Sequence, residues 1–371
     1  MRIDNPTKEE LRKYNDNLQN YIESNYSLVK TLYLDLGVKV VRLLCFSEEF
    51  LPHIKKQLDF VLLENAGKYD VTIVLWKENN ISQIHRKIIP NNLRLRVELL
   101  ACRDEVVNLQ VYSNDFSVSK PVLSVEGWHN IVNSYSEEKE TYFYGVENLE
   151  TEKFMEEGHL FFQIFNNILK TKSTNMVHGA CIGLDNNGIL LCARGARGKS
   201  TLSVLALTEG FDYVSDDYLT LEKDKDKDNL YAYPIYSIIT LSPRMYNELY
   251  NKLEGTRFIS NNARKDKYVI NISNFHEKFK KKYPIKLCMF PEIVSDKQPC
   301  INECSIKEKG RAITHIIHST IFQMNDHNDI KTVKKLIDML KKFKFYKIYL
   351  CNDIYKNVEC LRKFLKEYKN V

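Results

Sequence analysis

The chain has 371 residues, of which 44% are apolar and 27% are charged. This length predicts two domains, and the composition is that of a folded globular protein rather than a disordered one. Lys and Arg number 54 against 48 Asp and Glu, and the excess of +6 is spread along the chain. It therefore lacks the concentrated basic patch expected of a nucleic-acid-binding protein.

The sequence carries no signal for export or for a membrane. Residues 1–10 lack the apolar segment of a signal peptide, and no stretch of about 18 apolar residues occurs. Nine cysteines are scattered along the chain, and several, such as Cys192, lie in apolar runs where cysteine behaves as a small buried hydrophobe. We therefore predict reduced thiols, a cytoplasmic location and no membrane partner.

Residues 1–150 are predicted to form a small α+β domain. Apolar residues at helical spacing predict that the first 35 or so residues form a polar, tyrosine-containing helix. A strand over 38–45, a helix over 50–64 and a strand over 69–76 form one β-α-β passage, and short alternating runs over 85–150 predict an antiparallel meander. We assign this domain to substrate recognition or assembly.

Residues 151–371 are predicted to form a larger α/β domain. A helix over 152–170 opens it, and five of the chain's 13 glycines then lie between positions 179 and 198. In a chain so sparing of glycine, such a cluster indicates backbone that turns tightly or approaches a ligand closely. Later segments are predicted as strands over 218–221, 230–233 and 345–350, and as helices over 243–253, 332–342 and 356–368.

The candidate binding loop lies inside this glycine cluster. A buried-strand pattern over 188–193 leads into Arg194-Gly195-Ala196-Arg197-Gly198-Lys199-Ser200-Thr201, and a helix over 202–207 follows. In this order of strand, glycine loop and helix, loop N–H groups and the positive end of the helix dipole converge on phosphates. Lys199 is the expected lysine on the outer phosphates of a nucleotide, and Ser200 would place its hydroxyl on Mg²⁺.

Two adjacent carboxylates, Asp216 and Asp217, follow a predicted strand over 211–215. If this strand is a neighbour of the strand before the loop, the two carboxylates lie close to the loop. One carboxylate can hold Mg²⁺, and the other can accept a proton from an attacking hydroxyl. The spacing does not say which residue has which role, so both remain candidates for each.

Three segments together resemble the catalytic domain of the HPr kinase family: 177–183 with its His-Gly pair, 188–202 with the loop, and 210–217 with the two aspartates. The resemblance covers about residues 155–240. It implies a P-loop fold with a mixed sheet, related to PEP carboxykinase, and a serine or threonine kinase that uses ATP and Mg²⁺. It also implies that Lys199 grips the β- and γ-phosphates, that Ser200 binds Mg²⁺, that Asp216 or Asp217 is the base, and that His178 lies beside the nucleotide. A homo-oligomer is implied as well.

The loop departs from the family's pattern. Ala193 stands where the pattern G-x-x-x-x-G-K-[ST] begins with glycine, Ala196 replaces a loop glycine, and no Arg-Gly-Leu-Gly segment is present. The chain looks more like the divergent HPr-kinase-like proteins that phosphorylate other targets, including precursor peptides in bacterial peptide-maturation clusters. We therefore predict a peptide or protein acceptor. A kinase for a small hydroxylated metabolite and a non-catalytic ATP sensor remain the alternatives.

Two further groups of residues are candidates, one for contact with a phosphate and one for binding of a metal. Arg264 and Lys267 are candidates for a cation that reaches the transferring phosphate, with an exposed basic turn as the alternative. Cys300, Cys304, His315 and His318 have a spacing that superficially suggests zinc. Because the cysteine pair lacks flanking turn glycines and lies on a strand-like stretch, we predict ordinary core and surface residues there.

Overall fold

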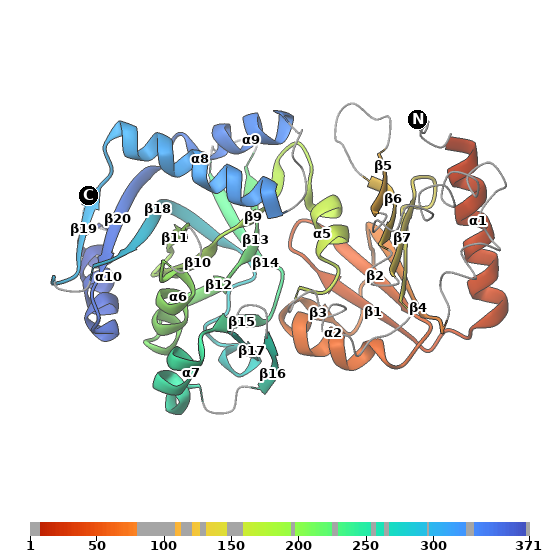
Figure 1. The fold of residues 1–371 in the computed structure, drawn as a ribbon, viewed down its shortest axis with the longest axis horizontal. Helices are drawn as coiled ribbons and strands as arrows, with labels where there is room; N and C mark the ends of the chain where they lie inside the picture. The colour runs from red at the N-terminus through yellow and green to blue at the C-terminus, as the bar shows by residue number, and fades with distance from the viewer. Residues whose placement is uncertain are drawn as a thin grey trace. The chain divides into compact units, whose positions relative to one another are not determined.

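The chain is a mixed α/β protein (Figure 1). The computed structural model describes residues 8–79, 108–112, 121–126, 131–146, 159–193, 197–224, 229–253, 257–262, 267–294, 297–323 and 330–368. The chain divides into two compact units: unit 1 is Met1–Asp35, Lys39–Lys55 and Leu62–Ile168, and unit 2 is Leu36–Val38, Lys56–Val61 and Leu169–Val371. The domain boundary expected at residue 150 stays a prediction, because residues 147–158 lie outside the described residues.

Unit 1 is built on an eight-stranded sheet, sheet A, with the strand order β3-β1-β2-β4-β8-β7-β6-β5. Its strands are β1 (Lys30–Asp35), β2 (Val40–Cys45), β3 (Leu62–Leu63), β4 (Val71–Lys77), β5 (Asn108–Tyr112), β6 (Pro121–Glu126), β7 (Ile131–Ser136) and β8 (Thr141–Val146). Strands β2 and β4 are parallel and are connected through helix α2 (Phe50–Leu58), which confirms the predicted β-α-β passage. Strands β5 to β8 are antiparallel neighbours, as the meander prediction requires, and residues 80–107 lie outside the described residues.

The two helices predicted near the start of the chain are shorter than expected. Helix α1 (Lys8–Asn25) ends well before residue 35, and residues 30–35 form β1 instead. Helix α2 ends at Leu58 and passes into the 3-10 helix η1 (Asp59–Val61), not into the helix expected to residue 64. The Phe60 N–H donates to Ser237 Oγ at 2.7 Å, so this N–H cannot continue the helical ladder.

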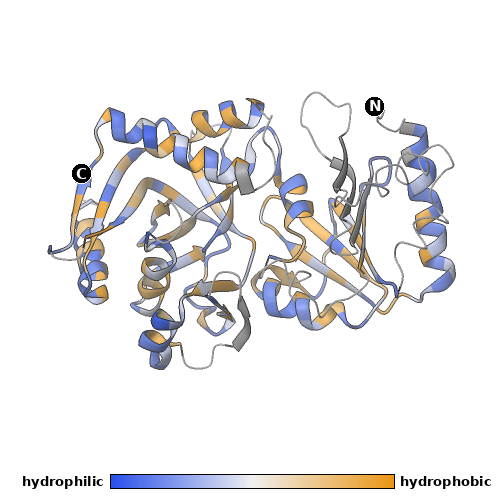
Figure 2. Cartoon of the chain, in the orientation of Figure 1, coloured by the Kyte–Doolittle hydropathy of each residue, from blue (hydrophilic) through white to orange (hydrophobic). Residues whose placement is uncertain are grey.

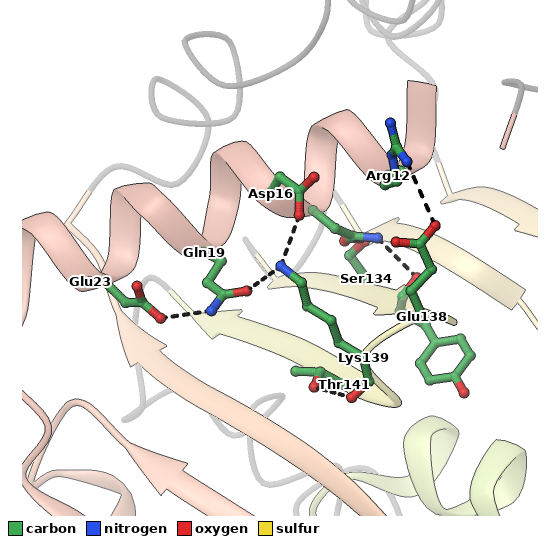
Figure 3. Close-up of polar contacts among 10 residues, drawn as sticks. Arg12, Asp16, Gln19, Glu23, Ser134, Glu138, Lys139 and Thr141 are labelled. Carbon is green, nitrogen blue, oxygen red and sulfur yellow. Dashed lines mark hydrogen bonds and ion pairs between the residues drawn. The ribbon is translucent and has the colours of Figure 1, made fainter. Parts of the chain in front are cut away.

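Helix α1 packs on the β7–β8 hairpin with an apolar face, and Figure 3 shows the polar contacts between the helix and the hairpin. Tyr14, Leu18 and Ile22 lie on the buried face at helical spacing. At the rim of this face, Lys139 Nζ lies 2.8 Å from Asp16 Oδ1 and 2.7 Å from Gln19 Oε1. These contacts set the register of the helix on the sheet of unit 1.

Unit 2 is built on a nine-stranded mixed sheet, sheet B, whose main path runs β12-β10-β11-β18-β14-β13-β9. Its strands are β9 (Thr174–His178), β10 (Ala180–Leu184), β11 (Asn187–Leu191), β12 (Asp212–Ser215), β13 (Tyr218–Lys223), β14 (Leu230–Pro234), β18 (Tyr283–Ile293), β19 (Cys300–Glu303) and β20 (Lys344–Leu350). Strands β11, β18 and β20 are parallel neighbours. Their carboxyl ends therefore meet at one edge of the sheet, which is where open α/β sheets place ligands.

Helices cover both faces of sheet B. Alternate residues of each central strand enter different cores: Ile189 and Leu191 pack with helices α6 (Lys199–Thr208) and α10 (Ile354–Tyr368), whereas Leu190 packs with α8 (Ile306–Gln323) and α9 (Ile330–Leu340). In Figure 2 these helices carry hydrophobic and hydrophilic residues side by side, as amphipathic helices on a sheet do. None of the described helices has the length and apolar content that a membrane span needs.

Two antiparallel segments of sheet B, β9–β10 and β12–β13, run side by side and share one bend. The chain runs from β9 through Gly179 into β10, and it runs from β12 through Asp216 and Asp217 into β13. His178 pairs with Tyr218 on one side of the bend, and Cys181 pairs with Ser215 on the other. At the bend itself, the Gly179 N–H donates to the Asp217 carbonyl at 2.9 Å, and Asp217 has a φ of 64°. We call this bend the aspartate corner.

A three-stranded sheet, sheet C, completes unit 2, with the order β15-β17-β16 from β15 (Ile238–Leu241), β16 (Arg257–Asn262) and β17 (Lys267–Asn271). The helix expected over 243–253 is divided into α7 (Pro243–Leu249), capped by Ser242, and the 3-10 helix η3 (Tyr250–Lys252). A further 3-10 helix, η4 (Ser273–Phe275), follows sheet C. Of the helix expected over 152–170, residues 152–158 lie outside the described residues. The described part is α5 (Phe162–Leu169), which follows Phe161 with its φ of 63°.

Candidate functional site

The loop between β11 and α6 places a glycine directly before the first helical residue. Gly198 has a φ of 90° and a ψ of 6°, the left-handed region that glycine adopts without a steric penalty. A Cβ built at this position would lie 2.7 Å from Leu350 Cδ1 of β20. Both the backbone angle and the contact with Leu350 therefore favour glycine at position 198.

Replacing Gly198 with alanine is expected to cost about 1–2 kcal/mol from the left-handed backbone, and more from displacing Leu350. Gly210→Ala is the matched control, because Gly210 has a φ of 88° and open space at the Cβ position. Urea denaturation of both variants separates the backbone effect from the packing effect. Equal losses of stability in the two variants would show that contact with Leu350 does not constrain the loop.

Lys199 is the first residue of α6, and its ammonium lies between the two aspartates. Its Nζ lies 3.0 Å from Asp216 Oδ1 and 2.9 Å from Asp217 Oδ1. The side chains of Lys199 and Asp216 are 7% and 1% exposed, while Asp217 is 17% exposed. The helix start and the aspartate corner are thus joined by a buried ion triad, Lys199–Asp216–Asp217.

The charges of the triad shift its proton equilibria. Burial works to lower the pKa of the Lys199 ammonium, but the two carboxylates outweigh burial and raise it above its ordinary value. Burial raises the pKa of Asp216, and although Lys199 and the Ser200 hydroxyl oppose this, Asp217 adds to it and the pKa stays above its ordinary range. One ammonium between two carboxylates leaves one negative charge in excess when both acids are ionised, which favours binding of a cation.

The two aspartates differ in their remaining oxygens. Asp217 Oδ2 accepts a hydrogen bond from the Thr240 hydroxyl of β15 at 3.0 Å. Asp216 Oδ2 is buried and has no hydrogen-bond partner among the described residues. A buried carboxylate oxygen with spare acceptor capacity, beside the hydroxyl of Ser200, is the hard oxygen donor set that Mg²⁺ prefers. Ser200, Asp216 and Asp217 are therefore the residues that fit a magnesium ion here.

Two other residues meet the aspartate corner. His178 ends β9, and its backbone N–H donates to Thr320 Oγ1 at 3.1 Å. The centroid of its ring lies 5.3 Å from that of the Tyr218 ring. Its role beside a nucleotide stays a prediction. Tyr213 of β12 is buried, and its pKa is raised by burial and by the nearby charges of Asp216 and Asp217. Neither Tyr213 nor Thr240 is predicted as a site residue from the sequence, because the residues around each predict only an ordinary strand.

The structure describes some of the predicted site residues, and others lie outside the described residues. Lys199, Ser200 and Thr201 lie in the first turn of α6, and Lys199 contacts Asp216 and Asp217. Exposed Arg197 precedes Gly198, while Arg194, Gly195 and Ala196 lie outside the described residues. The condition given for the aspartates to lie near the loop, that β12 is a neighbour of β11, is not met, because β10 lies between them. The aspartates reach Lys199 because the chain leaves β12 at the aspartate corner.

The remaining candidates belong to other elements or lie outside the described residues. Arg264 lies outside the described residues, and Lys267 begins β17, two residues before Val269, which pairs with Thr240. Cys300 lies on β19, and His315 and His318 lie on α8. In the described part of the chain, no group of three or more His, Cys, Asp or Glu side chains is arranged to hold a metal ion.

Comparison with known proteins finds a distant likeness to solved structures. No family model matches the chain. No curated protein matches it. Among solved structures, the HPr(Ser) kinase/phosphatase from Coxiella burnetii is similar at 12% identity and a TM-score of 0.28, over 53% of this chain and 99% of that chain. At this level of similarity, a function for the site has to be argued from its own residues.

Proposed function

We propose that this protein is an ATP-dependent kinase that transfers the γ-phosphoryl group of Mg-ATP to a serine or threonine hydroxyl of a peptide or protein. The observation that carries the proposal is the buried ion triad, which joins a lysine at a helix start to two adjacent carboxylates. The resemblance of segments 177–183, 188–202 and 210–217 to the HPr kinase family supports the same reading.

Each part of the triad has a task in such a transfer. The transition state of phosphoryl transfer is loose and highly charged, so catalysis depends mainly on positioning and neutralising the phosphates. Lys199 at the start of α6 would hold the β- and γ-phosphates, together with the free N–H groups of the first helical turn. Asp216 or Asp217 would accept the proton of the acceptor hydroxyl while the phosphoryl group moves to its oxygen and ADP leaves.

Magnesium would be held by Ser200, Asp216 and Asp217, and when bound it would neutralise the charge that develops on the phosphate oxygens. The buried, unpartnered Asp216 Oδ2 is the atom that most needs such a cation. We further propose that the N-terminal domain predicted over residues 1–150 recognises the acceptor or supports assembly of the chain into a homo-oligomer.

The test follows the γ-phosphate of labelled ATP with Mg²⁺, first on the purified protein and then with peptides and metabolites of a lysate separated by size. We expect label in a peptide or protein fraction with wild-type protein and none with Lys199→Ala. Lys252→Ala is the matched control, because Lys252 forms a more exposed ion pair with Glu209 and does not belong to the triad.

The other outcomes lead to different conclusions. Label in the small-metabolite fraction would identify a small-molecule kinase, the first alternative. ATP that binds but is never turned over would favour the sensor. Transfer by Lys199→Ala at the wild-type rate would show that the triad is not the site of the reaction.

A further inference from the structure

The Thr240 side chain, on β15, donates a hydrogen bond to a carboxylate of the triad. Its Oγ1 lies 3.0 Å from Asp217 Oδ2, while Lys199 Nζ lies 2.9 Å from Asp217 Oδ1. Asp217 is therefore held on both oxygens, by side chains from β15 and from α6. Thr240 itself is buried, at 6% exposure.

The hydrogen bond separates the two adjacent aspartates. Asp216 Oδ1 also contacts Lys199, but no described residue donates to its Oδ2. Asp216 is thus free to present one oxygen to a ligand, whereas the orientation of the Asp217 carboxylate is set at both of its oxygens. Nothing in the pair of identical residue types shows this difference; it comes from Thr240.

The surroundings of Thr240 make it a rigid anchor. Its backbone pairs with Val269 within sheet C, and its β-branched side chain has few rotamers available in a strand. The backbone of Asp217 is fixed independently by the Gly179 N–H and by its φ of 64°. With both backbones fixed, the hydroxyl determines the rotation of the Asp217 carboxylate.

We propose that Thr240 is a positioning residue, whose hydroxyl holds the Asp217 carboxylate in the orientation that receives the proton of the acceptor. This role rests on the proposed kinase function. Thr240 does not act as the acceptor itself, because it lies buried within a strand, and a phosphate on its oxygen would face the two carboxylates at close range.

The test compares Thr240→Val with Thr240→Ser. Valine keeps the shape and burial but removes the hydroxyl, so we expect a roughly tenfold to hundredfold lower kcat, from loss of a hydrogen bond to a charged group. Because the lost contact orients the base and does not bind the acceptor, we expect KM to stay unchanged. Lys199, Asp216 and Tyr213 also face Asp217 and are unchanged. Serine should restore kcat.

Thr220→Val is the matched control. Thr220 lies on β13 and is fully buried, and its hydroxyl has no hydrogen-bond partner among the described residues. The chemical change is the same, but it removes an unsatisfied polar group that does not touch the triad. We expect unchanged kcat and equal or higher stability.

A measurement that does not need turnover keeps this proposal separate from the kinase proposal. In ¹³C-labelled protein at a fixed pH, the signal of the Asp217 carboxyl should differ between Thr240→Val and wild type and return with Thr240→Ser, and an unchanged signal in Thr240→Val would overturn the positioning role. Phosphate found on Thr240 by mass spectrometry after incubation with Mg-ATP would overturn it as well. A wild-type protein that transfers no phosphate, but whose Asp217 responds to Thr240→Val, would disprove the kinase and leave the positioning intact.

Discussion

Replacing Lys199 with methionine is expected to destabilise unit 2 strongly at neutral pH and only weakly in acid. Removing one partner of a buried ion pair leaves uncompensated charge and costs about 3–5 kcal/mol. The pKa of Asp216 is already raised by burial, and loss of Lys199 removes an interaction that lowers it. Urea denaturation of wild type and Lys199→Met between pH 4 and pH 8 measures the effect.

The sign of this pH dependence follows from the direction of the shift. A carboxyl whose pKa is higher in the folded state than in the unfolded state contributes most below its unfolded pKa, which is near 3.8 for an aspartate. That contribution is lost as the pH rises through the folded pKa, so the variant falls further below wild type toward pH 8. Lys252→Met, at the more exposed pair with Glu209, should differ little from wild type. A pH-independent difference for Lys199→Met would contradict the buried triad.

Under the proposed function, replacing both aspartates with asparagine is expected to reduce phosphoryl transfer by at least about 10³-fold. An amide neither accepts the acceptor's proton at neutral pH nor balances the charge of Mg²⁺. The same change removes the two carboxylates that raise the pKa of Lys199, so its pKa falls under the remaining influence of burial. Labelled-ATP transfer measures the first effect, and ¹⁵N NMR of the lysine side chain measures the second.

The control for this double variant is Asp338→Asn with Asp353→Asn. Both aspartates lie at the surface of unit 2, where they pair with Lys341 and Lys356. Surface pairs of this kind contribute little, so transfer should remain at the wild-type rate. Retained transfer by Asp216→Asn/Asp217→Asn would exclude both residues as base and as metal ligands.

Local sequence pattern was enough to predict the elements that carry Lys199. The buried run before the loop and the helical run after it correspond to β11 and α6, because each depends on residues close in the chain. Gly198 was also expected, although its contact with Leu350 was not. Leu350 lies far along the chain, and no local pattern marks it as a neighbour of the loop.

The positions of the carboxylates depended on features that the sequence does not display. Asp217 takes a φ of 64°, and although an Asp-Asp pair is compatible with a turn, it does not mark a left-handed residue as a glycine would. Thr240 stands in the run Ile238-Ile239-Thr240-Leu241, where a β-branched residue indicates only a strand. Its contact with Asp217 is a tertiary one between sheet C and sheet B, and only the folded chain shows it.

The packing of Leu350 against Gly198 has a consequence for the order in which the protein matures during synthesis. Lys199, Asp216 and Asp217 leave the ribosome together, well before β20 has been made. Until β20 joins β18, nothing from that strand packs beside Gly198 to hold the start of α6. Under the proposed function, a nascent chain that already contains the whole ion triad is therefore expected to bind nucleotide poorly until translation has supplied Leu350.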